Sequence, residues 1–290
     1  MYIDINGKAR QKVGLHSHTT VSDGAWSREE SLASYKDLGY DAIAFTDHWK
    51  YGGADKIDGV AVISGAEYDV GGAGAENGVF HIVGLFMERE PELERATTEN
   101  AQQIIDAVHA VGGLAVLAHP AWSLNTPEMI MELKGVDATE IYNAVSEHGQ
   151  SFRPDSSVIV DMLACKKRYY PLLATDDTHY YKGIDNGKGF IMVECPTNDP
   201  AEIKKAIAEG RFYASQGPEI HLRRENDRFV VDCSPASKIY FASNVVWSWR
   251  VFEGEGITHA EYKPHANDRF VRAVVVDAEG KSAWTNIIEI

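Results

Sequence analysis

The clearest fold signal in this chain lies in Lys12-Val13-Gly14-Leu15-His16-Ser17-His18. Its first four residues form a short apolar run that predicts a β-strand, and the two histidines follow at its end. Side chains two positions apart on an extended segment point to the same face, so His16 and His18 should present their imidazoles together. A second apolar run, Ala42 to Phe45, ends in Thr46-Asp47-His48. Imidazoles gathered at the ends of neighbouring strands predict a metal site.

Similar motifs recur along the chain, most of them beside an apolar run that predicts a strand. In chain order they are Ser22-Asp23-Gly24, Gly65-Ala66-Glu67, Phe80-His81-Ile82, Ala118-His119-Pro120 and Asp176-Asp177-Thr178-His179. They supply carboxylates and imidazoles but no cysteine, which suits Mn, Fe, Zn or Mg better than a thiolate-rich structural zinc site. A single His-x-His pair is common by chance, so the prediction of a metal site rests on this recurrence.

The order and spacing of these motifs resemble those of the PHP (polymerase and histidinol phosphatase) family over roughly residues 12 to 215. The resemblance implies an α/β fold, a distorted seven-stranded β/α barrel, that holds two or three divalent metal ions (Mn, Fe or Zn). Carried over residue by residue, the implied metal ligands are His16, His18, Asp23, His48, Glu67, His81, His119, Asp177 and His179. Glu67 is implied to bridge two metals, and the family's Asp-x-His motif selects Asp177 over Asp176. Glu67, Asp177 and His179 are expected to act in catalysis.

The strand that His81 begins has a predictable direction, although the other proposed ligands follow their strands. The preceding segment, Gly71 to Gly78, is rich in turn residues. It is too short for the crossover of about a dozen residues or more that joins parallel strands. We therefore expect this strand to run antiparallel to the one that carries Glu67. Its beginning would then lie beside the end of its neighbour, which places Glu67 and His81 at the same edge.

Strands and helices alternate through the first two thirds of the chain. Helices are expected over residues 27–39, 98–111, from 126 onward, 154–168 and 199–210, and a last barrel strand over 189–194. The helix near residue 27 is the best marked, because Ser27-Arg28-Glu29-Glu30 has the form of a capping box. Such alternation predicts a mostly parallel sheet or barrel, in which function sits at the C-terminal ends of the strands.

The chain changes character near residue 217, so we expect domains at 1–216 and 217–290. Short segments of alternating apolar and polar residues follow, separated by turn residues such as Gly254-Glu255-Gly256. They predict a small antiparallel β-sandwich. Gly210 to Pro218 and Gly280 to Ile290 resemble the PHP branch of carbaryl-hydrolase-type metallohydrolases, which pairs a short barrel with a C-terminal β domain. Trp247-Ser248-Trp249 is expected to pack in the core of this domain, with an interface patch as the alternative.

The composition limits the kinds of partner and the cellular compartment that we expect for this protein. Lys and Arg number 28 against 43 Asp and Glu, a net charge of −15 that disfavours binding to long nucleic acids. No apolar stretch approaches the roughly 18 residues that cross a membrane. The three cysteines, Cys165, Cys195 and Cys233, are scattered and suggest reduced thiols in a cytoplasmic protein. The expected partner is a small phosphoester molecule, and a homo-oligomer remains open.

The function predicted from these features is a metal-dependent hydrolase, with a phosphoesterase as the first hypothesis. Metal ions about 3.5–4 Å apart lower the pKa of a bridging water toward 7, so a metal-bound hydroxide would be the nucleophile. The chain lacks both the Gly-x-Ser-x-Gly elbow of serine hydrolases and a P-loop. With three carboxylate ligands, three divalent ions leave about +3, which favours a phosphate dianion. Two ions and one hydroxide leave about zero, which suits a neutral ester.

Several assignments have alternatives at this stage. A carboxylic ester or carbamate hydrolase with the same metals is the first alternative function, and a non-catalytic binding module is the second. Arg153, Asn143 and Lys182 follow predicted strand ends and are candidates for contacting substrate, with Arg153 first because a guanidinium binds phosphate bidentately. Asp47 is expected either to accept a proton from a ligand imidazole or to cap the end of its strand.

Overall fold

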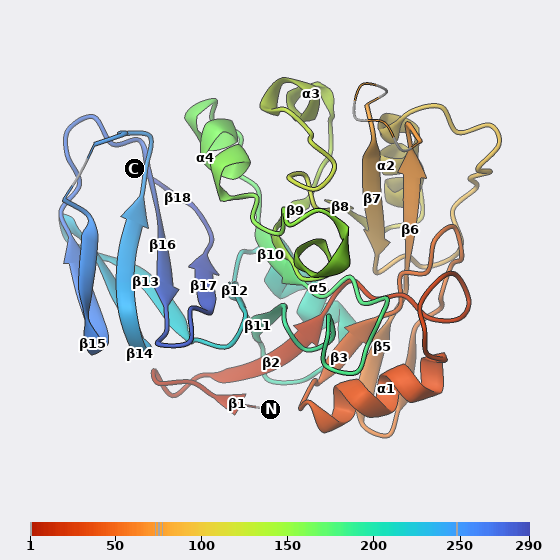
Figure 1. Ribbon diagram of the computed structural model, residues 1–290, viewed down its shortest axis with the longest axis horizontal. Coiled ribbons are helices and arrows are strands. Elements are labelled where there is room, and N and C mark those ends of the chain that lie inside the picture. Colours follow the sequence, from red (N-terminus) through yellow and green to blue (C-terminus); the bar gives the residue numbers. More distant parts are fainter. Residues whose placement is uncertain (1, 73, 75, 77, 248) are drawn as a thin grey trace.

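The computed structural model describes residues 2–72, 74, 76, 78–247 and 249–290, and it has a mixed α/β architecture built from two large sheets with few helices (Figure 1). The smaller sheet has five strands in the order β10-β9-β8-β7-β6. Their bounds are β6 Gly65–Val70, β7 Phe80–Leu85, β8 Leu114–Leu117, β9 Ala138–Asn143 and β10 Leu172–Thr175.

The larger sheet has thirteen strands among the described residues. Its main row of hydrogen-bonded strands has the order β13-β14-β16-β17-β12-β11-β2-β3-β5-β4. Strands β1, β15 and β18 attach at the side of this row, to β2, β14 and β16. The strands of the N-terminal part are β1 Tyr2–Ile3, β2 Ala9–Gly14, β3 Ala42–Ala44, β4 Asp55–Ile57, β5 Val60–Ile63, β11 Phe190–Glu194 and β12 Phe212–Ser215. Those of the C-terminal part are β13 Ile220–Glu225, β14 Arg228–Ala242, β15 Val251–Tyr262, β16 Phe270–Val276, β17 Ser282–Thr285 and β18 Ile288–Glu289.

Strand directions are more mixed than the expected mostly parallel sheet. β2, β3 and β5 run parallel to one another, as do β8, β9 and β10. The antiparallel pairing of β6 with β7 confirms the direction predicted from the short turn before His81, although Ala73, Ala75 and Asn77 of that turn lie outside the described residues. β11 is antiparallel to β2, because the connection from β10 to β11 contains no crossover helix.

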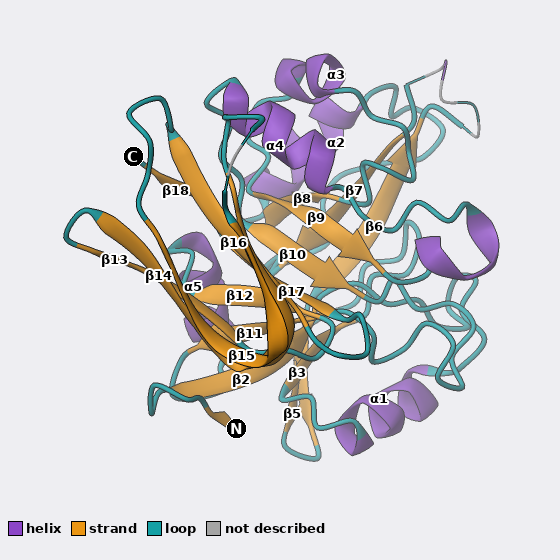
Figure 2. Ribbon diagram, turned by 60° about the vertical axis from the view of Figure 1, so that its left-hand side comes forward, coloured by secondary structure: helices purple, strands orange, loops and turns teal. Residues whose placement is uncertain are grey.

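The helices lie close to their predicted positions, with ends that differ by a few residues. They are α1 Arg28–Asp37, α2 Ala101–Ala110, α3 Pro127–Glu132, α4 Ser157–Cys165 and α5 Pro200–Ala208, with a π-helix at Ser146–Gln150. The capping box at the start of α1 is confirmed, since Ser27 accepts from the Glu30 amide and Glu30 from that of Ser27. In Figure 2, α2, α3 and α4 lie together over one side of the smaller sheet. No helix in the described part of the chain is long and apolar enough to cross a membrane.

Two isolated bridges join the two sheets at one edge. Ser17, just after β2, pairs with Thr178, just after β10, and His48, just after β3, pairs with Glu67 in β6. Both bridges are parallel and both lie within the predicted ligand motifs. The bridges therefore hold the strand ends that carry these motifs close together, as a barrel-type fold requires. The closed seven-stranded barrel itself remains a prediction, since the hydrogen-bonded ladders describe two sheets.

The C-terminal strands continue the larger sheet. β17 pairs with β12, with Tyr213 opposite Thr285, and the Trp284 ring stacks on Tyr142 of the smaller sheet with centroids 5.6 Å apart. The barrel strands and the C-terminal strands thus share apolar core residues. A separate β-sandwich and a domain boundary at residue 216 therefore remain predictions, because backbone pairing runs across that position.

Two local predictions in the C-terminal region were wrong. Gly254-Glu255-Gly256 lies inside β15 rather than in a turn between strands, and it forms an irregularity there, since the register with β14 shifts and Gly256 has a φ of 64°. Trp247 and Trp249 do not pack in the core, since they are 62% and 90% exposed. They lie in the connection between β14 and β15, and Ser248 between them is outside the described residues. Aromatic residues predict burial on average, but a loop outside both sheets offers no apolar face to cover them.

Candidate metal centre

His16 and His18 lie just beyond β2, where the alternation of an extended segment turns both imidazoles inward. Both side chains are fully buried, and their Nε2 atoms lie 3.3 Å apart. The Nε2 atoms of His16 and His18 lie 3.2 Å and 3.1 Å from Oδ1 of Asp177. They also lie 3.3 Å and 3.1 Å from Oε2 of Glu67. Two imidazoles and two carboxylates from three strands therefore converge on one point.

Glu67 lies in β6 at the centre of the cluster and faces different histidines with its two oxygen atoms. Oε2 lies 3.1 Å from Nε2 of His18 and 3.3 Å from Nδ1 of His48. Oε1 lies 2.8 Å from Nδ1 of His81 and 3.3 Å from Nε2 of His119. A carboxylate with imidazoles grouped around each oxygen has the arrangement needed to bridge two metal ions.

Asp23 and His179 form the outer side of the cluster. Nε2 of His179 lies 3.5 Å from Oδ1 of Asp23, and Nε2 of His48 lies 3.7 Å from its Oδ2 atom. Among the nine predicted ligands, only Asp23 has a side chain that is mostly exposed to solvent, with an exposed fraction of 53%. The adjacent Gly24 is required sterically, because a Cβ atom there would collide with the His18 carbonyl.

The structure brings eight of the nine predicted ligands together in three overlapping groups that could hold a metal ion. They are His18, Asp23, His48 and His179; His16, His18, Glu67 and Asp177; and His48, Glu67 and His81. His119 lies beside the last group through its contact with Glu67. The residues lie on the loops after β2, β3, β8 and β10 and within β6 and β7, so distant parts of the sequence meet at one edge.

Two buried atoms show that the cluster suits cations. Nδ1 of His48 and Oδ1 of Asp177 are inaccessible to solvent, yet neither has a hydrogen-bond partner. Buried polar atoms without partners are rare because each costs about 1–3 kcal/mol. Both atoms are acceptors that divalent ions use as ligands, in a donor set of imidazole and carboxylate. The residues present therefore fit divalent metal ions.

The charges of the cluster are mutually stabilised. Burial alone would lower the pKa of His18, but the adjacent carboxylates of Asp177 and Glu67 raise that pKa to about 9. Burial likewise opposes the charged form of His16, while Asp177, Glu67 and Glu140 together raise its pKa well above the usual value. For Asp177, burial raises the pKa, but His16 and His18 lower it below its ordinary range. In the metal-free protein, protons on the histidines therefore supply the positive charge that metal ions would supply.

Two of the ligand positions have strained backbones. His119 has a φ of 28° and Asp177 a φ of 51°, a left-handed region that non-glycine residues seldom occupy. Such strain costs about 1–3 kcal/mol and persists where the surrounding structure imposes it, often at functional sites. Here it turns His119 and Asp177 toward Glu67 and the paired histidines.

Glu140 is a central residue that sequence reasoning missed. It lies in β9 with 1% exposure, and its Oε1 atom accepts a hydrogen bond from Nδ1 of His16 at 2.7 Å. Its Oε2 atom accepts from the His119 amide at 2.9 Å and from Nδ2 of Asn143 at 2.8 Å. This contact fixes the ring of His16 so that Nε2 faces the cluster. The available signal was a carboxylate within a short strand segment, Ala138–Asn143, as it was for Glu67.

We expect Glu140→Gln to weaken metal binding about 10–100-fold, because the His16 ring loses the carboxylate that orients it and raises its basicity. Competition with a fluorescent chelator would measure the affinity. Glu132→Gln, on an exposed position of α3, is the matched control and should bind metal like the parent. Equal affinity in the Glu140 and Glu132 variants would contradict the role of Glu140.

The acidic neighbours of the ligands hold the loops around the cluster. Asp47 accepts from the amide and hydroxyl of Thr19 and from the hydroxyl of Ser22, so it anchors the loop that carries Asp23 rather than a ligand imidazole. Asp176 turns away from the cluster and accepts three backbone amides of residues 187–189. Burial raises the pKa of Asp176 to about 6 despite those hydrogen bonds.

The three candidate substrate contacts lie in different surroundings. Asn143 is buried and donates to Glu140 and, at 3.1 Å, to Oδ2 of Asp177, a geometry that favours an orienting role. Arg153 is exposed, and its guanidinium reaches the Trp122 carbonyl at 3.4 Å. Lys182 is exposed on the loop after His179 and does not line the metal pocket. Substrate contact by these three residues remains a prediction.

A pocket of about 410 Å³ opens over the cluster. Its lining consists of Asp23, Ala25, His48, His81, His119, Trp122, Asp177, His179 and Tyr180. Trp122 packs edge-on against His119 and His81, with ring centroids 4.8 Å and 5.4 Å away. No Lys or Arg is part of this lining in the described residues, so an anionic group entering the pocket would depend on metal ions for charge neutralisation.

Comparison with solved structures identifies the fold. A two-domain protein from Bacteroides vulgatus that contains a predicted PHP-like metal-dependent phosphoesterase has a TM-score of 0.58 and 15% identity, covering 100% of this chain and 97% of that chain. An amidohydrolase from Chromobacterium violaceum with bound sulfate has a TM-score of 0.43 and 16% identity, covering 69% and 96%. Endonuclease Q in complex with a 27-mer duplex substrate has a TM-score of 0.48 and 17% identity, covering 69% and 57%.

The expectation that long nucleic acid is excluded remains a prediction. No protein-family model matches the chain, and no curated protein matches its sequence. The likeness to the Bacteroides vulgatus protein extends over the barrel strands and the C-terminal strands alike. The family resemblance inferred from the motifs is thus confirmed at the level of structure: this chain has a PHP-like fold.

Proposed function

We propose that the protein is a metal-dependent hydrolase that cleaves a small phosphoester. The observation that carries the proposal is Glu67, whose two oxygens face separate groups of histidines inside a buried cluster. Such a centre, loaded with divalent ions, lowers the pKa of a bound water toward 7 and neutralises the oxygens of the group under attack. The proposed ligands are the nine residues predicted from the sequence, with two or three ions of Mn, Fe or Zn.

The protein's own groups have distinct parts in this proposal. Glu140 and Asn143 orient His16 and Asp177 through hydrogen bonds of 2.7 Å and 3.1 Å. His179 lines the open side of the pocket near the half-exposed Asp23, where a leaving group would depart, and its part is to hold a metal ion there. Trp122 shields the inner histidines from solvent, which strengthens the electrostatic interactions in the pocket.

The charge count favours a phosphoester over a neutral ester when three ions bind. Glu140 adds a fourth carboxylate to Asp23, Glu67 and Asp177. Three divalent ions then leave about +2, which attracts a phosphate, whereas two ions leave about zero. A carboxylic ester or carbamate hydrolase is therefore the second candidate, and it is favoured by the same centre with two ions.

Turnover of a matched substrate pair would test the proposal. Protein reconstituted with Mn²⁺ should hydrolyse p-nitrophenyl phosphate, and His16→Ala, which removes a buried ligand, should be inactive. Hydrolysis of p-nitrophenyl acetate alone would overturn the phosphoesterase and leave the ester or carbamate hydrolase. Metal analysis of the same samples would show whether the phosphatase activity requires the third ion.

Arg153→Ala is expected to raise the KM for p-nitrophenyl phosphate about 10-fold with little change in kcat, because the guanidinium at the pocket's edge attracts the substrate anion. Any weak turnover of the neutral acetate should be unaffected. Arg89→Ala, at an exposed position away from the pocket, serves as the control. An unchanged KM for the phosphate would exclude Arg153 from substrate binding.

Metal affinity should rise with pH between about 6 and 9, because metal ions must displace the protons on His16 and His18. The expected gain in metal affinity is up to about tenfold per pH unit for each proton displaced.

The folding stability of the metal-free protein should instead fall as the pH rises. Folding raises the pKa of His18 from 6.5 to about 9, so this stabilisation is full below 6.5 and is lost as the pH rises through about 9. Metal titrations would measure the affinity, and denaturation of the metal-free protein would measure its stability, across this pH range. If both quantities changed in the same direction with pH, the prediction would be wrong.

A further inference from the structure

A second hollow adjoins the metal pocket between the start of α3 and α4. This groove has a volume of about 510 Å³, within the range of small-molecule sites. Its apolar lining comprises Leu124, Pro127, Phe152, Val158, Ile159 and Met162. Arg153 and Asp155 are its only charged lining residues in the described chain, and their formal charges cancel. The groove therefore suits an uncharged hydrocarbon better than a nucleotide or an ionic peptide.

Several large apolar side chains of the groove are open to solvent. Phe152 is 81% exposed and Val158 is 70% exposed, while Leu124 and Met162 are also open to solvent. Leu124 and Phe152 have φ values of 57° and 53°, a left-handed conformation that is costly for bulky residues. Strained backbone that holds large apolar side chains in water is typical of a binding surface rather than of folding alone.

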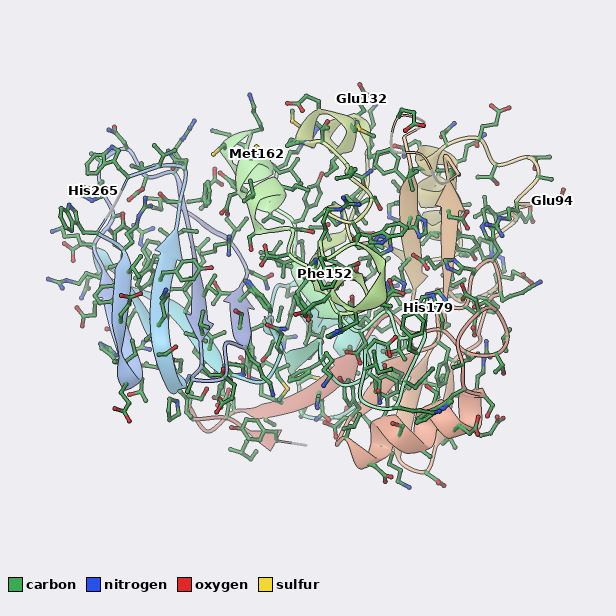
Figure 3. All side chains as sticks on the ribbon, viewed as in Figure 1. Glu94, Glu132, Phe152, Met162, His179 and His265 are labelled. Carbon is green, nitrogen blue, oxygen red and sulfur yellow. The ribbon has the colours of Figure 1, made fainter. Side chains whose placement is uncertain are left out.

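The groove and the metal pocket have separate linings that come next to each other at Ala121 and Trp122. Trp122 lines the pocket, its neighbour Ala121 lines the groove, and the Arg153 guanidinium contacts the Trp122 carbonyl at 3.4 Å. In the projection of Figure 3, the labelled Phe152 lies between Met162 on α4 and His179 at the metal centre. A molecule held in the pocket can therefore extend over Trp122 into the groove.

We propose that the groove binds an apolar organic group of the substrate, so that the protein prefers phosphoesters with a hydrocarbon portion. This inference rests on the proposed phosphoesterase function. The metal pocket accepts the phosphoryl group, because its lining offers ligands for metal ions but no Lys or Arg. The groove accepts the hydrocarbon portion of the substrate, which metal ions cannot bind. Burial of that part supplies affinity and selects the substrate.

A chain-length series of alkyl phosphates tests the inference. Ethyl, butyl, hexyl and octyl phosphate would be compared with the Mn²⁺-reconstituted protein by release of inorganic phosphate. Each methylene that enters the groove should raise kcat/KM about twofold. In free energy this is about half of the effect of burying a methylene completely, because the groove is open to solvent. The increase between ethyl and octyl phosphate should then be roughly 60-fold.

Val158→Asp tests the groove directly, and Val251→Asp is its matched control. Val158 lies in the first turn of α4, where an acidic residue favours the helix dipole, so the variant should fold. Val251 has a comparable exposure of 56% but lies in β15, away from the groove. Val158→Asp should lower the ratio of kcat/KM for octyl phosphate to that for ethyl phosphate about tenfold, whereas Val251→Asp should leave this ratio unchanged. Circular dichroism and thermal melting would confirm that both variants fold.

Each outcome has a defined meaning. A chain-length dependence that Val158→Asp removes and Val251→Asp keeps supports the inference. Turnover that is equal for all chain lengths, or equal in the two variants, overturns this inference and leaves the phosphoesterase standing. Self-association that Val158→Asp abolishes, without any chain-length effect, also overturns it by making the groove an interface between copies. Absence of turnover for every alkyl phosphate would instead overturn the proposed function itself.

Discussion

Replacing Glu67 with Gln is expected to reduce metal-dependent hydrolysis at least about 100-fold and to lower the number of bound ions. Gln keeps the size of the side chain but removes the negative charge that both groups of histidines share. The Oε2 atom of Glu67 lies 3.1 Å from His18, and its Oε1 atom lies 2.8 Å from His81. A neutral amide cannot bridge two cations with the same strength. Phosphate release and metal analysis on the same preparation would measure both effects.

Glu132→Gln again provides the control, because it makes the same chemical change at an exposed site. The variant at Glu67 could also lose stability, so thermal melting without metal must accompany the assay. Removal of a buried carboxylate that pairs with several histidines changes the metal-free protein as well. A Glu67→Gln protein that binds as many ions as the parent and turns over substrate at a similar rate would refute the bridging role.

Asp161→Ala is expected to destabilise the fold by about 3–5 kcal/mol, because it leaves a buried guanidinium unpaired. Arg272 of β16 is almost fully buried, and its Nε and one terminal nitrogen lie 2.7 Å and 2.9 Å from the Asp161 carboxylate on α4. The other terminal nitrogen already lacks a hydrogen-bond partner. The pair joins the C-terminal strands to the helical side of the barrel. Chemical denaturation would measure the loss.

A double variant separates the charge effect from lost packing. Asp161→Ala combined with Arg272→Met removes both charges and keeps an apolar chain in the buried position. It should recover most of the lost stability, because replacing a buried ion pair with apolar groups is often neutral. Equal destabilisation of the single and double variants would show that packing, not the unpaired charge, dominates. A single cooperative transition in all three proteins would indicate that residues 1–216 and 217–290 unfold together.

The direction of the strand that begins at His81 shows how far local sequence reaches. A turn too short for a crossover leaves only the antiparallel arrangement, so chain connectivity alone predicts that Glu67 and His81 share an edge. The choice between Asp176 and Asp177 also rests on local sequence. The family's Asp-x-His motif selects Asp177, and in the structure Asp176 faces backbone amides while Asp177, with a φ of 51°, faces His16 and His18.

The C-terminal strands show where local patterns fail. Glycines at 254 and 256 are typical of a turn, yet they lie within β15, because the residues on either side of them pair with the long strand β14. The exposure of Trp247 and Trp249 likewise depends on which elements lie nearby. Strand propensity and hydrophobicity describe average environments, whereas pairing partners and neighbours come from chain segments far away in sequence.

The sequence by itself determined the strand-end motifs, the types of ligand and the likeness to the PHP fold, because local periodicity and chain connectivity specify which side chains share a face. Only the tertiary structure decided that Glu140 orients His16 and that Glu67 turns one oxygen toward each group of histidines. It also decided that Leu124 and Val158 form one groove beside the pocket. These contacts join residues from separate strands and helices, and their distances depend on how the two sheets pack against each other rather than on any single segment.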